Sequence, residues 1–128
     1  MSLTNDFETS VLTWLLTASS PSPARPTAWH IGLFTAAPGE SGGGTEVSGG
    51  SYVREAVTFT VSGDTASNNA AIEWPTATGN WGTISHIAVF DAATSGNMLV
   101  YGALTAAKAI DTGDVFRIPS GDLDITLN

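Results

Sequence analysis

A serine, a histidine and a few carboxylates are the residues of this chain that could carry out catalysis. Ser85, His86 and Asp91 have the residue types of a nucleophilic triad, in which the histidine takes a proton from the serine hydroxyl. However, no Gly-x-Ser-x-Gly turn surrounds the serine, and adjacent residues of a strand point to opposite faces of a sheet. The pattern therefore argues against nucleophilic catalysis.

A second possible chemistry is glycoside hydrolysis by two carboxylates. Glu55 and Glu73 could form such a pair if the fold set their carboxyl groups at a suitable separation. Nothing in the sequence brings these two residues together. The alternative, two exposed carboxylates on strands, is favoured, and no catalytic residue is predicted.

Metal binding would need hard oxygen ligands, because the chain has no cysteine and only two histidines. Asp111 with Asp114, and Asp122 with Asp124, are the closest acidic pairs. Neither pair has the spacing of an EF-hand loop. We interpret them as turn formers and solvated strand residues, and we predict no metal ion and no cofactor.

A glycine-rich segment, residues 39–51, contains six of the fourteen glycines and raises the question of phosphate binding. A phosphate-binding loop needs a lysine and a following helix, but this segment has no lysine, and Glu40 and Glu46 would repel a phosphate. The segment is typical of a long, mobile loop between strands. We predict that it contacts neighbouring subunits through Gly42, Gly43, Gly44, Glu46 and Val47.

The composition excludes several classes of partner. The 128 residues carry a formal net charge of −8 with only four basic side chains, which are scattered along the chain. Nucleic acid and anionic membrane surfaces would be repelled. Only 12% of the residues are charged and 42% are hydrophobic, which favours a surface that lies against other subunits. The first residues show neither a basic secretion signal nor an apolar run long enough to span a membrane.

The N-terminal region predicts one helix over residues 5–17. Asn5 and Glu8 resemble a capping box, and apolar residues then recur at helical spacing. We expect this stripe to be buried against the sheet or an adjacent subunit. Residues 18–27 contain three prolines and predict a stiff connector. The stripe consists of Phe7, Val11, Trp14 and Leu15.

Residues 28–128 predict a β domain, because the apolar period changes from 3.6 to 2 and turn residues separate short apolar segments. In "YVREAVTFTV" the period places Val53, Val57, Phe59 and Val61 on one face. About seven or eight strands result, and the economical fold is a single mainly β domain, either a β-sandwich or a jelly-roll-like barrel. Trp81 is the one tryptophan expected in a loop, where core or interface packing is favoured over sugar stacking.

Most of the chain resembles a family of small virion proteins of tailed bacteriophages, described as tail-fibre-like or head-decoration-like. The N-terminal segments "LTNDFETSVLTWLL" and "HIGLFTAAPGE" occupy the expected places in that family. The resemblance implies a β-rich structural protein without catalytic activity, and a homotrimer. It is carried by "GTEVSGGSYVREAVTF", "PTATGNWGTISHIAVFDA" and "LVYGALTAAKAIDTGDVFRI".

Three functions remain open at this level. The first hypothesis is a capsid decoration or cement protein, bound to the major capsid protein on the capsid surface, because the domain is small, weakly charged and has a glycine-rich arm. The second is a tail-fibre, tail-tip or baseplate component that contacts tail proteins and possesses a glycan-binding surface at Trp81 or the glycine-rich segment. The third is a glycan hydrolase, for which the sequence offers no motif.

Overall fold

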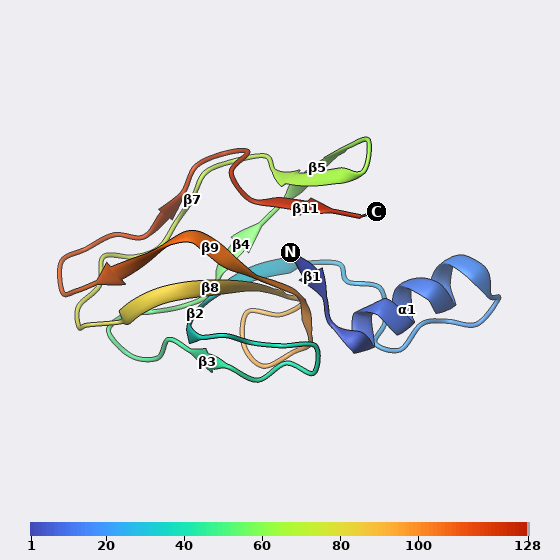
Figure 1. The fold of residues 1–128 in the computed structure, drawn as a ribbon, viewed down its shortest axis with the longest axis horizontal. Helices are drawn as coiled ribbons and strands as arrows, with labels where there is room; N and C mark the ends of the chain where they lie inside the picture. The colour runs from blue at the N-terminus through green and yellow to red at the C-terminus, as the bar shows by residue number, and fades with distance from the viewer. Residues whose placement is uncertain (128) are drawn as a thin grey trace.

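The structure, a computed structural model, describes residues 1–127 as a two-layer β-sandwich with one helix (Figure 1). It confirms the mainly β fold that the sequence predicts, although the described residues form eleven strands rather than seven or eight. The elements are β1 (Ser2–Leu3), α1 (Asn5–Leu16), β2 (Trp29–Ala36), β3 (Thr45–Glu46), β4 (Glu55–Val57), β5 (Phe59–Ser62), β6 (Thr65–Asn68), β7 (Ile72–Glu73), β8 (Gly82–Phe90), β9 (Met98–Ile110), β10 (Arg117–Ile118) and β11 (Asp124–Thr126).

The larger sheet is antiparallel and has the order β1-β9-β8-β2, with β3 and β4 both paired to the outer edge of β2. Strand β4 pairs with the first residues of β2, and β3 pairs with its last residues. Strand β8 lies in the middle, and most of its C-terminal half is buried. Strand β8, which accounts for most of "TISHIAVFD", is therefore a central strand with neighbours on both edges.

The second layer consists of β5, β6 and β11 on one side and β7 with β10 on the other. The β6–β11 pair and the β7–β10 pair lie one after the other, because β6 is followed by β7 in the chain and β10 is followed by β11. Trp74 N donates a hydrogen bond to Phe116 O at 3.0 Å, and Asn68 N donates one to Leu123 O at 3.2 Å. The buried Asn68 side chain bonds to the backbone of Ala70, Pro119 and Leu123 and so satisfies the irregular step between the ladders.

The main hydrophobic core lies between the two layers. Alternation along β2 and β8 turns one set of side chains toward the second layer, where the rings of Trp74 and Phe116 meet edge to face at 5.3 Å. A smaller cluster, centred on the stacked rings of Phe34 and Phe90, lies on the opposite face of the large sheet. The central members of the main core are Ile31, Leu33, Val57, Ile72, Trp74, Ile84, Ile87, Val89, Phe116, Ile118 and Leu123.

The segment "YVREAVTFTV" does not form one strand with one apolar face. It divides at Thr58, so that β4 belongs to the large sheet and β5 to the second layer. Val57 is buried in the core, whereas Val53 and Val61 are exposed. The prediction that these valines share a buried face was wrong because the chain turns a corner of the sandwich within the segment, which breaks the period.

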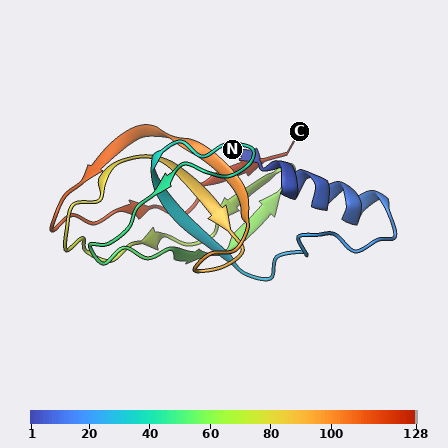
Figure 2. The same ribbon diagram turned by 90° about the horizontal axis from the view of Figure 1, so that it is seen from below.

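Helix α1 begins at the predicted residue and ends one residue early, with Thr4 as its N-cap. The helix points away from the sandwich at one end of the molecule (Figures 1 and 2). Phe7 packs on the core, but the side chain of Trp14 is 56% exposed and Leu15 is also exposed. Within one chain the predicted burial of the stripe was therefore wrong, because the sheet ends before it can cover the last turns of the helix.

We predict that the cost of truncating an apolar side chain follows its burial. Trp74 is 1% exposed, so Trp74→Ala should lower the free energy of unfolding by about 3–5 kcal/mol. Val61→Ala, on exposed β5, should change it by less than about 0.5 kcal/mol. Urea unfolding followed by far-ultraviolet circular dichroism measures both variants, and equal losses would contradict the core described here.

Candidate functional site

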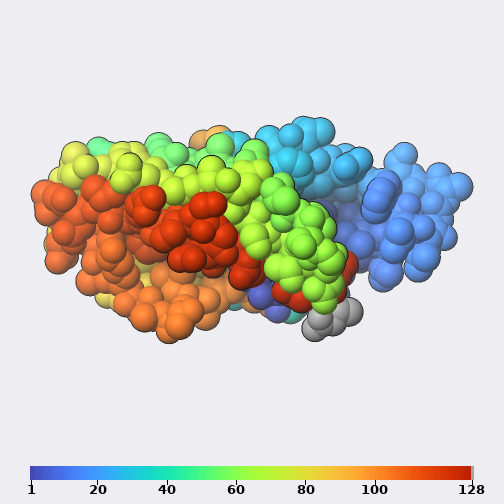
Figure 3. Space-filling view, turned by 90° about the horizontal axis from the view of Figure 1, so that it is seen from above, coloured from blue at the N-terminus to red at the C-terminus, as the bar shows by residue number. Residues whose placement is uncertain are grey.

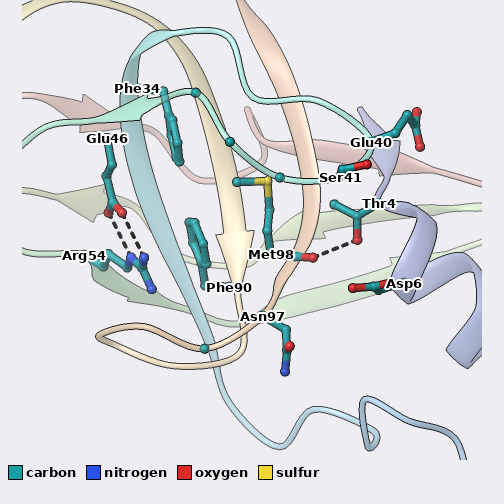
Figure 4. A pocket seen from close by; sticks show the side chains of 14 residues that line it. Thr4, Asp6, Phe34, Glu40, Ser41, Glu46, Arg54, Phe90, Asn97 and Met98 are labelled. Carbon is teal, nitrogen blue, oxygen red and sulfur yellow. Dashed lines mark hydrogen bonds and ion pairs between the residues drawn. The ribbon is translucent and has the colours of Figure 1, made fainter.

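A groove of about 390 Å³ lies on the face of the large sheet that points away from the second layer. The glycine-rich segment, the start of α1 and the β8–β9 turn surround it (Figure 4). Its floor is formed by the apolar side chains of Phe34, Phe90 and Met98. We call it the outer groove, and its polar lining residues are Thr4, Asp6, Glu40, Ser41, Glu46, Arg54 and Asn97.

An ion pair between Glu46 and Arg54 forms one wall of the outer groove. Arg54 Nε donates to Glu46 Oε2 and Nη2 donates to Oε1, both at 2.8 Å. Tyr52 Oη donates to the same Oε2 at 2.7 Å and accepts from the backbone N–H of Leu33 at 2.9 Å. The two parallel bonds give the planar guanidinium a fixed orientation, so these contacts connect β2, β3 and the segment before β4.

The same guanidinium reaches the turn between β8 and β9. Arg54 Nη1 donates to Ala92 O at 3.1 Å and to Ser95 O at 2.8 Å. Its central carbon lies 3.5 Å from the centre of the Phe90 ring, where the ring face attracts a cation. The Arg54 side chain is only 9% exposed, so its charge is occupied inside the protein and is not offered to a ligand phosphate.

These contacts change the acidity of both partner groups. Burial raises the pKa of Glu46. The hydrogen bonds from Arg54 and Tyr52 and the charge of Arg54 together lower it by more than burial raises it, so the pKa lies below its ordinary value. Burial and the hydrogen bond to Glu46 raise the pKa of Tyr52 well above its ordinary value. Near neutral pH the glutamate is therefore ionised and the phenol is protonated.

The glycine-rich segment is folded against the domain and is not a free arm. Val47 is buried, Glu46 is held by Arg54, and Gly39 and Gly42 form a bridge. A Cβ on Gly44, which has a φ of +75°, would lie 2.7 Å from the carbonyl oxygen of Ala36. The prediction of a mobile loop was wrong for this reason: the segment carries its own anchors between the glycines.

The predicted subunit-contact residues do not form one surface. Gly42, Gly43, Gly44 and Glu46 line the outer groove, where nothing lies near a Cβ built on Gly42 or Gly43. Val47 and Trp81 are core residues, and Trp81 Nε1 donates to Gly50 O at 2.9 Å. That burial confirms packing and removes Trp81 as a sugar platform. Phe7, Val11 and Trp14 lie on α1, where they line a different groove.

The other polar side chains of the outer groove are two carboxylates, two hydroxyls and one amide. Glu40 accepts from Tyr101 Oη at 2.7 Å, and this bond raises the pKa of Tyr101. Asn97 donates from its backbone and side chain to Asp91. The sequence analysis did not identify Arg54 and Tyr52. The one available signal was that Arg54, a basic residue, follows Glu46 by eight positions and could pair with it.

Ser85 and His86 do contact each other, contrary to the sequence argument. Ser85 Oγ lies 2.8 Å from His86 Nδ1, next to an irregular step in the register between β8 and β9. The bulge changes the direction of the side chains, which the strict alternation of a strand would have separated. Asp91 is held by Asn97 on the β8–β9 turn, so the structure does not assemble a triad.

The remaining candidate groups are separate in the fold. Glu55 lies on β4 of the large sheet and Glu73 on β7 of the second layer, and Asp114 accepts a hydrogen bond from the backbone N–H of Asp111 within a turn. Residues 1–127 contain no cluster of three histidine or carboxylate side chains suited to a metal ion. Over the same residues, α1 is too short to cross a bilayer.

One protein family matches this chain over residues 2–126, and its description is "Podophage GP4 fiber I protein gp80". The match covers nearly the whole length. The chain belongs to this family. It is a phage virion structural protein, as the resemblance implied. No curated protein matches the chain.

We predict that Arg54 and Glu46 are energetically coupled. In a double-mutant cycle of Arg54→Ala and Glu46→Ala, the free energies of unfolding should deviate from additivity by about 0.5–3 kcal/mol. The control cycle combines Glu46→Ala with Arg25→Ala, because Arg25 lies on the connector and shares no contact with Glu46. Urea unfolding measures all variants, and additivity in both cycles would show that the ion pair contributes nothing.

We also predict an acid-dependent loss of stability from Glu46. Its folded pKa is depressed, so its contribution is fully present above the unfolded value of about 4.3 and disappears as the pH falls through the lower folded value. At neutral pH, Glu46→Gln should lower the free energy of unfolding by about 1–3 kcal/mol. Urea unfolding over a pH series should show this difference shrinking in acid, and a constant difference would contradict the assignment.

Proposed function

We propose that this protein is a non-enzymatic structural component of a podophage tail fibre, bound to other tail proteins. The single observation that supports this function is the family match over residues 2–126, since the description of the family names a fibre protein. The match supports the tail over the capsid surface.

The geometry of the described residues is compatible with a structural role. Asp91 is held by Asn97 and does not complete a triad with Ser85 and His86. The one cation that lines the outer groove, Arg54, is engaged by Glu46 and backbone carbonyls. The hydrogen-bonding capacity of the sandwich is therefore used mainly to hold its own loops in place.

The capsid decoration hypothesis has less support. It rested in part on a free glycine-rich arm that would order against a capsid neighbour, but Glu46 and Val47 hold that segment on its own domain. The family description names a fibre protein and not a capsid protein.

Labelling of intact virions tests the location. Antibody raised against the purified protein and detected by electron microscopy should decorate the tail and leave the head unlabelled, and an antibody to the major capsid protein serves as the control. The number of copies per virion, measured by quantitative mass spectrometry against the capsid protein, should be small. Uniform labelling of the head with copies in the hundreds would contradict the fibre assignment and restore capsid decoration.

A further inference from the structure

Helix α1 is apolar on two opposite sides. Successive residues of a helix turn by about 100°, so Phe7, Val11 and Trp14 share the side toward the connector, Leu12 and Leu16 lie nearly opposite, and Leu15 lies between the two groups. An apolar side of a helix is normally packed against another element. The second side, which we call the leucine ridge, is 57–73% exposed and consists of Leu12, Leu15 and Leu16.

A groove of about 270 Å³ lies on the connector side of the same helix. Ser10 Oγ donates to Pro23 O at 2.9 Å, which holds the connector beside the helix. The guanidinium of Arg25 lies 5.8 Å from the centre of the Trp14 ring at the rim. We call this the helix groove, and its apolar lining residues are Phe7, Val11, Trp14, Pro21, Pro26 and Trp29.

The charge pattern of this end favours self-association. No charged residue occurs from Thr9 to Ala24, although the chain has a net charge of −8. The flanking charges are of opposite sign, with Asp6 and Glu8 in the first turn of α1 and Arg25 on the connector. Two copies can therefore approach through this end without the repulsion that their other surfaces produce.

A lipid surface is a poorer occupant for the same helix. Helices that lie on membranes carry lysine or arginine on their polar face, and α1 carries no basic residue but has Asp6 and Glu8. Helix and connector project beyond the sandwich (Figures 2 and 3), and the leucine ridge on this projection is exposed.

We propose that a second copy of this chain covers α1, with the leucine ridge of one copy packed against the helix groove of the next. A ridge and a groove at the same end of one chain form a heterologous pair of surfaces, which closes into a ring when the rotation between copies permits. The interface does not depend on where the protein lies in the virion, so it can be correct even if the fibre assignment fails.

The test is the mass of the purified full chain, measured by sedimentation velocity and light scattering over a dilution series. The wild-type protein should have the mass of two or more chains and should dissociate on dilution. Leu12→Lys/Leu16→Lys should have the mass of one chain at concentrations where the wild type is assembled. The matched control is Val61→Lys on β5, an exposed apolar residue far from α1 in the sequence, which should keep the wild-type mass.

A second variant tests whether the lysine substitutions act by unfolding the helix. Leu12→Ala/Leu15→Ala/Leu16→Ala keeps a high helix propensity and should raise the concentration of half-assembly at least tenfold, while near-ultraviolet circular dichroism of the core aromatic rings stays unchanged. A single-chain mass for the wild type throughout, or the wild-type mass for both ridge variants, would overturn the proposal. So would a monomeric wild type whose ridge variants are lost from virions, because another virion protein would then cover the helix.

Discussion

The buried charge of Arg54 is the constraint on which the outer face of the sandwich depends. A guanidinium removed from water is costly unless charged or polar partners replace its hydration. Glu46 supplies two of its bonds, and the carbonyls of Ala92 and Ser95 supply two more. Because these partners belong to β3 and to the β8–β9 turn, satisfying one side chain positions two segments that are distant in the sequence.

The Arg54–Glu46 pair also restricts which residue can stand at Gly32 of β2. A Cβ on Gly32 would lie 2.9 Å from Glu46 Oε2 and 3.0 Å from the ring of Phe90, so only glycine leaves room for both the carboxylate and the aromatic ring under the guanidinium. The positive φ of Gly44 likewise lets the chain return from the end of β2 into β3. Two glycines at different places thus serve the same ion pair.

The sequence predicts the parts of the fold in which local pattern and tertiary position agree. The apolar run of β8 and the helical start of α1 are examples, and each lies where its period indicates. The corner at Thr58 and the bulge beside Ser85 could not be predicted, because each is set by which sheet the next residues join and not by their own side chains. The outer groove was missed for a related reason. In the sequence Arg54 has the pattern of a polar residue on the solvent side of a strand, and its partners are known only from the fold.

The two ends of the molecule differ in how far their interactions are completed within one chain. In the sandwich, Asn68 and Arg54 find partners for their buried polar groups, and the aromatic rings are covered from both layers. At the helix end, the same short element that contributes Phe7 to the core leaves its outer leucines in water, which is an unfavourable arrangement for apolar surface. The chain thus satisfies a buried arginine with four hydrogen bonds but leaves the leucine ridge uncovered. The largest group of exposed apolar side chains therefore lies on α1, whereas the charges of Arg54 and Glu46 in the wall of the outer groove are paired with each other.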